Sequence, residues 1–172
     1  MLPDEAPRLA EIFRASILEL TGDDYTEEQQ EAWAAAADNE ALFAKRLADE
    51  VTIVATMGGA PVGFASLECK DKIDFFYVHP AAVERGAGAM LADALEKLAA
   101  ARGAEALSVD ASETAYGFFT KRGYAAQQRN SVPRGDEWLS NTTMKNMLGA
   151  QETAQLNRFL VIRPSRDSDR FI

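Results

Sequence analysis

A continuous block of β-branched and aromatic residues occupies the centre of the chain, between residues 51 and 80. The block is VTIVATMGGAPVGFASLECKDKIDFFYVHP, and the pair Gly58-Gly59 interrupts it. Val, Ile, Thr, Tyr and Phe favour extended backbone, and paired glycines between such runs are typical of a tight hairpin turn. The block therefore predicts three neighbouring antiparallel strands.

Helical patterns precede this block. Residues 4–20 place apolar side chains at the spacing of one helix face, which predicts an amphipathic helix. A second helix is expected to begin at Thr26, because Thr26 and Gln29 have the reciprocal spacing of a capping box and the nearby glutamates suit the helix dipole. Residues 39–49 predict a third, short helix.

Beyond the central block, helix and strand patterns alternate. Residues 88–104 predict a helix, and residues 106–112 predict a short buried strand. A helix capped by Ser112 follows, and residues 124–147 predict two strands around a turn at Pro133 to Gly135. This order of elements indicates the α/β (α+β) class with a mixed sheet.

Composition restricts the class of protein. The 172 residues have the length of one domain, and 47% of them are hydrophobic, which is enough for a substantial core. The formal net charge of -9 argues against nucleic acid and against an anionic membrane as partners, and would favour a cationic substrate. No stretch reaches the roughly 18 apolar residues of a membrane helix. With one cysteine, no internal disulfide and no leader pattern, a cytoplasmic protein is expected.

The turn Gly86-Ala87-Gly88 lies between the last predicted strand of the block and the next helix. A dinucleotide fingerprint would need glycine where Leu91 stands, and no Gly-Lys-Ser/Thr follows, so two known phosphate loops are excluded. A helix start with free N–H groups and small residues can still hold a pyrophosphate, with the charge of Arg85 beside it. The alternative is an ordinary glycine turn that opens a helix.

Several segments together resemble the GNAT superfamily of acyl-coenzyme A dependent N-acetyltransferases. The window Val83-Glu84-Arg85-Gly86-Ala87-Gly88 is similar to its signature Gln/Arg-x-x-Gly-x-Gly/Ala, although Val83 replaces the polar first position. YVHP before it and SETAYGFFTKRGY after it also resemble family segments, over residues 4–147 in all. DYTEEQQEAWA, VDAS, GFFTKRGY and EWLSNTTM are similar to a bacterial subgroup. The resemblance implies a single domain over residues 1–148, with a twisted, mostly antiparallel sheet of six to seven strands and about four flanking helices.

The resemblance also implies acetyl-coenzyme A as co-substrate and no metal. Its pyrophosphate would lie against the backbone of residues 85–90, and its thioester near Phe76 through Val78, where the family stabilises the oxyanion with backbone N–H groups. The cofactor-binding residues expected in this way are Phe76, Tyr77, Val78, Arg85, Gly86, Ala87, Gly88, Ala89, Met90, Ser112, Phe119 and Lys121.

Catalysis needs a group that deprotonates the amine, because a free alkylamine has a pKa near about 10 and is mostly protonated at neutral pH. Asp74 is the first candidate by resemblance, with Asp71 or Glu68 as alternatives, and a solvent-facing strand residue is the non-catalytic interpretation. The tyrosine that protonates the thiolate in many members is replaced here by Phe119. Tyr116, one turn earlier, or water could take that role.

Other residues allow simpler interpretations. His79 before Pro80 favours turn structure, and Cys69 favours core packing over a nucleophile; a Cys-His pair for hydrolysis has no supporting motif. An acidic cluster near the second helix is either a solvated face or an attractor for a cationic substrate; it consists of Asp23, Asp24, Glu27, Glu28 and Glu31. Tyr25, Trp33 and Trp138 either pack in the core or line the acceptor groove.

The chain begins in the turn that follows the first strand of the family, so that strand is expected to be absent. Near the other end, RFLVIRPSRDSD resembles the missing strand. Residues 149–172 form a tail in which Phe159 to Arg163 either pairs beside VTIVAT, within one molecule or across a homodimer, or remains disordered. The preferred function is acetylation of a small-molecule or peptide amine, and the alternative is a catalytically silent acyl-coenzyme A binding or sensor module.

Overall fold

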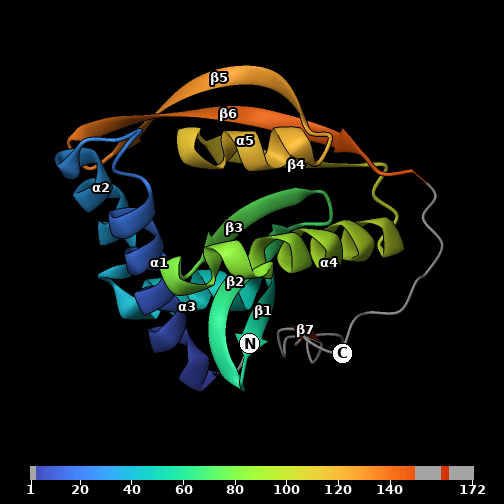
Figure 1. Ribbon diagram of the computed structural model, residues 1–172, viewed down its shortest axis with the longest axis horizontal. Helices are drawn as coiled ribbons and strands as arrows, with labels where there is room; N and C mark the ends of the chain where they lie inside the picture. The colour runs from blue at the N-terminus through green and yellow to red at the C-terminus, as the bar shows by residue number, and fades with distance from the viewer. Residues whose placement is uncertain (1–2, 150–159, 163–172) are drawn as a thin grey trace, which may run out of the picture.

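The computed structural model describes residues 3–149 and 160–162, in which helices surround one twisted sheet (Figure 1). The α-helices are α1 Ala6–Leu20, α2 Glu27–Ala34, α3 Glu40–Asp49, α4 Ala87–Ala101 and α5 Glu113–Lys121. The strands are β1 Val51–Met57, β2 Ala60–Glu68, β3 Lys72–Val78, β4 Ala106–Ser112, β5 Ala125–Arg134, β6 Glu137–Met147 and β7 Leu160–Ile162. Short 3-10 helices are η1 Pro3–Glu5, η2 Ala35–Ala37 and η3 Pro80–Arg85.

The strands form one mixed sheet of order β5-β6-β4-β3-β2-β1-β7 in the described part of the chain. Every pairing is antiparallel except that of β3 with β4. The predicted class, the mostly antiparallel mixed sheet and the three neighbouring strands of the central block are confirmed. The described residues contain five α-helices, where about four were expected.

The helix starts follow the capping chemistry that the sequence predicts. The Thr26 hydroxyl accepts a hydrogen bond from the N–H of Gln29, and the Gln29 side chain accepts one from the N–H of Thr26, which is a complete capping box. The Ser112 hydroxyl accepts from the N–H of Ala115 and begins α5 directly at the end of β4. These caps satisfy helix donors that would otherwise lack a partner.

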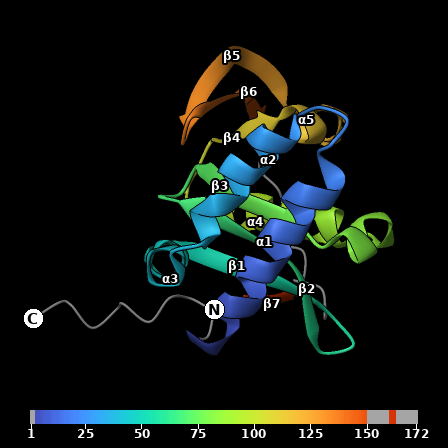
Figure 2. The same cartoon turned by 90° about the vertical axis from the view of Figure 1, so that its left-hand side faces the viewer.

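Two hydrophobic clusters lie on opposite faces of β1, β2 and β3. On one face, α4 inserts Leu91 and Leu95 against the sheet. On the other face, α1 and α3 bring Phe13 and Phe43 into a group of aromatic rings with Phe75 of β3. Figure 2 shows the same arrangement, with α3 and α4 on opposite sides of these strands. Strand β3 therefore lies between two cores and is held in a fixed position.

The sheet divides between β3 and β4. These parallel strands pair only through Lys72 with Ser108 and Ile73 with Val109. Beyond this point β4 stays paired with β6 as far as Ser112, whereas β3 stays paired with β2 as far as Val78. Figure 1 shows the two parts apart, β4 to β6 with α5 above and β1 to β3 with α4 below. The two strands therefore diverge where an active site can open.

Two local expectations are wrong. Cys69 is exposed and lies in the turn between β2 and β3 with φ of 56°, so it is neither a strand residue nor part of the core. The hairpin turn between β5 and β6 consists of Gly135 and Asp136, because Pro133 and Arg134 still pair with Trp138 and Glu137. In both places the strand registers, which depend on residues across the sheet, determine where the turn lies.

Strand β7 pairs antiparallel with β1, and Val161 lies opposite Val54. Pairing beside β1 within one molecule is one of the alternatives that the sequence predicts for Phe159 to Arg163. The residues at its expected ends, Phe159 and Arg163, lie outside the described residues, as does most of the proposed tail. The domain boundaries stay a prediction. In the part of the chain that the structure describes, no helix is long and apolar enough to cross a membrane.

Candidate active site

One pocket, with a volume of about 460 Å³, extends from the start of α4 through the gap between β3 and β4 to the hairpin of β5 and β6. At one end it is lined by small residues of the α4 start, Gly86, Gly88 and Ala89. At the other end α1, α2 and the hairpin form its walls; the lining residues there include Ile17, Tyr25, Trp33, Arg134, Leu139 and Asn141. The pocket therefore joins a helix start to a second, partly aromatic chamber.

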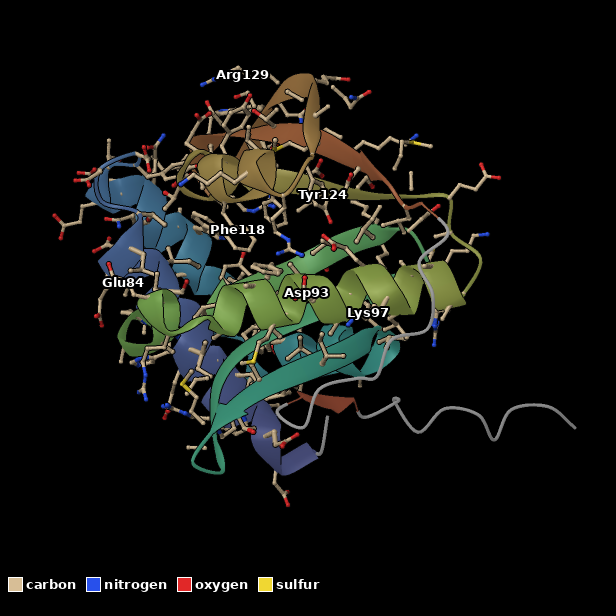
Figure 3. The ribbon with its side chains drawn as sticks, turned by 45° about the vertical axis from the view of Figure 1, so that its right-hand side comes forward. Glu84, Asp93, Lys97, Phe118, Tyr124 and Arg129 are labelled. Carbon is tan, nitrogen blue, oxygen red and sulfur yellow. The ribbon has the colours of Figure 1, made fainter. Side chains whose placement is uncertain are left out.

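The α4 start has the geometry of an anion site. Gly86 is the N-cap with φ of 84°, a left-handed conformation that glycine adopts without strain. A side chain at Gly88 would have its Cβ 3.5 Å from the ring of Phe118, so it would enter the slot between α4 and α5. Figure 3 shows Phe118 above α4 on this side of the molecule. Free helix N–H groups thus face a slot that only small residues leave open.

Backbone N–H groups of β3 face the gap in the sheet. The N–H of His79 donates to the carbonyl of Val62 on β2, at 2.7 Å. Successive N–H groups in a strand point to opposite sides, so those of Phe76 and Val78 point away from β2, toward the side where β4 has diverged. Both residues line the pocket. The geometry therefore provides two fixed donors at the point where the expected thioester carbonyl would lie.

Asp74 lies on a bulge of β3. Ser66 of β2 opposes both Asp74 and Phe75, because the register changes from Ala65 with Phe76 to Leu67 with Ile73. A bulge bends the strand and changes the direction of its side chains. Asp74 lines the pocket, and its Oδ2 accepts a hydrogen bond of 2.7 Å from Arg46 of α3.

Glu50 is a second carboxyl group beside Asp74. It lies between α3 and β1, and its Oε2 accepts a hydrogen bond from the hydroxyl of Ser66, which in turn accepts from the N–H of Phe75 at 3.1 Å. Burial and hydrogen bonding to Asp74, together with the negative charge of Asp74, raise the pKa of Glu50 to about 7. Glu50 can therefore hold and release a proton near neutral pH.

Lys72 of β3 and Asp110 of β4 line the pocket where the two strands begin to diverge. The Nζ of Lys72 is 3.6 Å from Asp110 and 3.6 Å from Glu68. Burial lowers the pKa of Lys72, but these carboxylates and Asp74 raise it by more, so the ammonium stays charged. Asp110 also accepts a hydrogen bond of 2.6 Å from Thr143 of β6. Lys72 is therefore not a candidate base.

Helix α2 closes the aromatic chamber. The Trp33 Nε1 donates to the hydroxyl of Tyr77 at 3.2 Å, and burial raises the pKa of Tyr77 to about 12. The Tyr25 hydroxyl donates to the carbonyl of Ser140 at 2.6 Å and accepts from the N–H of Glu113 at 2.9 Å. These bonds join α2 to β3, and the turn before α2 to β6 and α5, so the wall of the chamber is held from three sides.

The structure brings most of the sequence-predicted residues to this pocket. Those that line it are Asp74, Phe76, Tyr77, Val78, Gly86, Gly88, Ala89, Ser112 and Phe119. Arg85, Ala87, Met90 and Lys121 do not line it, although the first three belong to the same turn and helix start. Tyr116 is on another side of α5, where it lines a shallow depression with Arg129 of β5. Its expected catalytic role thus has no support from its position.

Further expectations concern the residues around the groove. Tyr25 and Trp33 line the pocket, whereas Trp138 is 62% exposed and does not. The acidic cluster is exposed and lies outside the lining. The His79 Nδ1 accepts from the N–H of Ala81, as turn structure requires. Asp71 is exposed and also lies outside the pocket lining.

Sequence reasoning missed Glu50, Arg46 and Arg134. Each is a charged residue at the end of a helix or strand, and such residues are usually solvated. Only the fold brings Arg46 and Glu50 to Asp74, and only the hairpin register brings Arg134 into the pocket lining. No local motif marks them. In the described residues, no group of three or more His, Cys, Asp or Glu side chains has the arrangement of a metal site.

Comparisons with known proteins identify the family of the chain. The family model described as "Acetyltransferase (GNAT) domain" matches residues 21–148. An uncharacterized N-acetyltransferase of Escherichia coli (strain K12), YafP, is 29% identical over 143 residues, which cover 83% of this chain and 90% of that protein.

Two solved structures have the same fold. A GCN5-related N-acetyltransferase from Rhodopseudomonas palustris, also described as "Aminotransferase, Class-II", is 60% identical with a TM-score of 0.85; the match covers 86% of this chain and 92% of that one. The PaiA N-acetyltransferase of Thermoplasma acidophilum, solved in complex with coenzyme A, is 16% identical with a TM-score of 0.71 over 86% of this chain and 95% of that one, a likeness of fold alone. The chain therefore belongs to the GNAT family of N-acetyltransferases.

Proposed function

We propose that the protein transfers an acetyl group from acetyl-coenzyme A to a primary amine of a small molecule or peptide, by direct attack in a ternary complex. The observation that carries this proposal is the continuity of one pocket from the glycines of the α4 start to Asp74. A single pocket lets both substrates be present together, so no acylated protein intermediate is needed. Cys69, the one thiol of the chain, is exposed in a turn and does not line this pocket.

The residues present fit coenzyme A. Gly86 and Gly88 leave the slot beside Phe118 free of side chains, and the N–H groups at the start of α4 are suitable donors for phosphate oxygens. Val83 lines the pocket and is 44% exposed, so the polar contact that the family signature makes there is replaced by an apolar surface. The backbone N–H groups at the start of α4 would therefore make most of the contacts with the phosphates of coenzyme A.

Acetyl-coenzyme A would supply an activated acetyl group as a thioester. The N–H groups of Phe76 and Val78 would hold the carbonyl oxygen, and because the sheet fixes them, they need no reorganisation when negative charge develops on it. Asp74 would position the ammonium group of the acceptor. The proton would then pass to the pair of carboxyl groups of Asp74 and Glu50, in which Glu50 can hold a proton near neutral pH.

A second candidate function, a silent acyl-coenzyme A binding module, is favoured by the surroundings of Phe119. Its ring is 1% exposed and lies 5.3 Å from that of Phe76 and 5.0 Å from that of Tyr124, centroid to centroid. The position where many family members carry an acidic hydroxyl is thus apolar. Under the preferred function, water protonates the leaving thiolate, which coenzyme A tolerates because a thiolate is a moderately good leaving group.

A steady-state assay for free thiol, run with acetyl-coenzyme A and a panel of amines, separates the two functions. Amine-dependent thiol release with one acetylated amine formed per thiol supports the transferase. Acetyl-coenzyme A binding, measured by calorimetry on the same preparation, without release on any amine supports the binding module.

A further inference from the structure

We propose that the acceptor amine also carries a carboxylate and that Arg134 binds this carboxylate in the aromatic chamber, an inference that rests on the proposed acetyl transfer. The acceptor would then be an amino acid or another short amino carboxylate. The inference follows from the charged side chains of the pocket, which are Lys72, Asp74, Asp110 and Arg134.

Three of these four charges are already paired within the protein. Lys72 lies 3.6 Å from Asp110, and Asp74 accepts a 2.7 Å hydrogen bond from Arg46. Their charges are largely compensated, so a ligand is not required to neutralise them. Arg134 is different, because among the described residues it forms no ion pair with any carboxylate.

Arg134 retains most of its hydrogen-bonding capacity. Its Nη1 donates to the carbonyl of Pro133, its own chain neighbour, at 2.9 Å. A guanidinium has five N–H donors in a planar fork that matches the two oxygens of a carboxylate. Arg134 is the last residue of β5, where the short turn of Gly135 and Asp136 holds the strand end against the pocket. The residue is exposed, so a ligand can reach its free donors from the pocket.

The location of Arg134 separates its ligand from coenzyme A. Its positive charge acts on the buried hydroxyl of Tyr77, where it opposes the rise in pKa that burial causes. The ring of Tyr77 packs against that of Phe13 of α1, in the hydrophobic cluster on the face of the sheet opposite α4. Arg134 therefore faces the chamber of α1 and α2, in which the acceptor binds, and not the α4 start.

The charges of the chamber have the order that an amino carboxylate requires. Its ammonium group would lie near Asp74 and Asp110, next to the N–H groups of Phe76 and Val78, and its carboxylate near Arg134. A purely cationic amine would place its charge in the same chamber as an uncompensated guanidinium, which is unfavourable. The net charge of -9 favours cations around the whole protein, but the charged side chain that the hairpin contributes to the pocket lining is the cation Arg134, which favours an acid.

The test compares acids with their primary amides. Thiol release is measured with glycine, β-alanine, 4-aminobutanoate and L-phenylalanine, each beside its amide, for the wild type, Arg134→Gln and Arg134→Lys. Arg129→Gln is the matched control, because Arg129 is on the same strand but pairs with Glu113 at 2.9 Å outside this pocket. Figure 3 shows Arg129 at the outer side of β5. Circular dichroism melting of each variant verifies that it is folded.

The expected result is that the wild type uses at least one acid with a kcat/KM about ten- to a hundredfold above that of its amide. Arg134→Gln should lose this preference through a higher KM for the acid, with the amide changed less than about threefold. Arg134→Lys should restore part of it, since a lysine keeps the charge but not the fork. Equal use of acid and amide by the wild type, or an equal loss for both in Arg134→Gln, would overturn the proposal.

A separate binding experiment tests the carboxylate site independently of acetyl transfer. Calorimetry with L-phenylalanine and its amide, on protein saturated with coenzyme A, requires no turnover. Arg134-dependent binding of the acid without any thiol release would retain the carboxylate site and reject the transferase. Release on amides alone, with no binding of the acid, would retain the transferase and reject the carboxylate site.

Discussion

The guanidinium of Arg46 on α3 holds the carboxylate of Asp74 on β3 at 2.7 Å, and the same guanidinium lies 4.6 Å from the centre of the Phe75 ring. Asp74 and Phe75, which are neighbours on β3, thus both contact the guanidinium of Arg46 on α3. The arrangement fixes Asp74 at the mouth of the gap between β3 and β4, beside Glu50. A carboxylate held in this way can orient an ammonium group and accept its proton.

Replacing Asp74 by Asn should lower kcat by about 100- to 10,000-fold, because this is the usual contribution of a general base. The side chain keeps its size, and binding of acetyl-coenzyme A should stay within about threefold of the wild type. The measurement is kcat at saturating amine from pH 6 to 9, together with calorimetry for the coenzyme.

Asp71→Asn and Glu68→Gln are the matched controls for Asp74. Both residues are acidic, exposed, and close to Asp74 in sequence, and neither lines the pocket. Their kcat values should remain within about twofold of the wild type, the usual range for a surface charge away from the reacting atoms. A large loss in Asp71→Asn with none in Asp74→Asn would mean that Asp71, and not Asp74, is the base.

Glu50→Gln should change the pH profile of kcat. In the wild type the acid limb is expected near pH 7, the pKa to which burial and the neighbouring Asp74 raise Glu50. Removing the carboxyl of Glu50 should remove the limb near pH 7, because the group with the raised pKa is then absent. Glu28→Gln, an exposed change on α2, should leave the profile unchanged.

The same substitution tests stability. Because the pKa of Glu50 is higher in the folded chain than its usual 4.5, the folded state binds this proton more tightly. Its contribution to stability is complete below about pH 4.5 and is lost as the pH rises through about 7. Glu50→Gln should therefore raise Tm at pH 8 by about 2–4 °C, which corresponds to about 1 kcal/mol at this chain length, and change it little at pH 4.5. A fall in Tm at pH 8 would contradict the assigned direction.

Local patterns were sufficient for the order of helices and strands and for part of the pocket. The caps at Thr26 and Ser112 and the glycines of the α4 start depend on a few neighbouring residues, so the sequence alone predicts them. The proximity of Glu50 to Asp74 depends instead on how α3 crosses β3 and on the bulge opposite Ser66. Such contacts follow from the packing of the whole chain, and no spacing in the sequence indicates them.

Tyr116→Phe should leave kcat within about twofold of the wild type, because Tyr116 lies in a depression outside the pocket and surface changes away from the reacting atoms have small effects. The expected acid role of Tyr116 would need its hydroxyl in the gap between β3 and β4. The kcat of Tyr116→Phe and of the wild type is measured from steady-state rates at pH 7 and 8.5. A loss of tenfold or more, greater at the higher pH, would restore Tyr116 as the proton donor.

A size series at Gly88 should separate coenzyme binding from catalysis. The Cβ of Gly88→Ala would lie at an ordinary 3.5 Å from Phe118, so KM for acetyl-coenzyme A should rise less than about threefold. Gly88→Val should raise this KM about tenfold or more, because its methyl groups would occupy the slot. Gly117→Ala on α5, where a Cβ meets nothing within 4 Å, is the control and should leave KM unchanged. An unchanged KM in Gly88→Val would mean that the slot does not hold the coenzyme.

Direct transfer requires both substrates to occupy this pocket together, and the pattern of initial rates shows whether they do. Rates of thiol release are measured over a grid of acetyl-coenzyme A and amine concentrations, and double-reciprocal plots are drawn at each fixed amine concentration. The expected lines intersect, because direct transfer takes place in a ternary complex. Parallel lines, with an acetylated protein detected by mass spectrometry in the absence of amine, would contradict it.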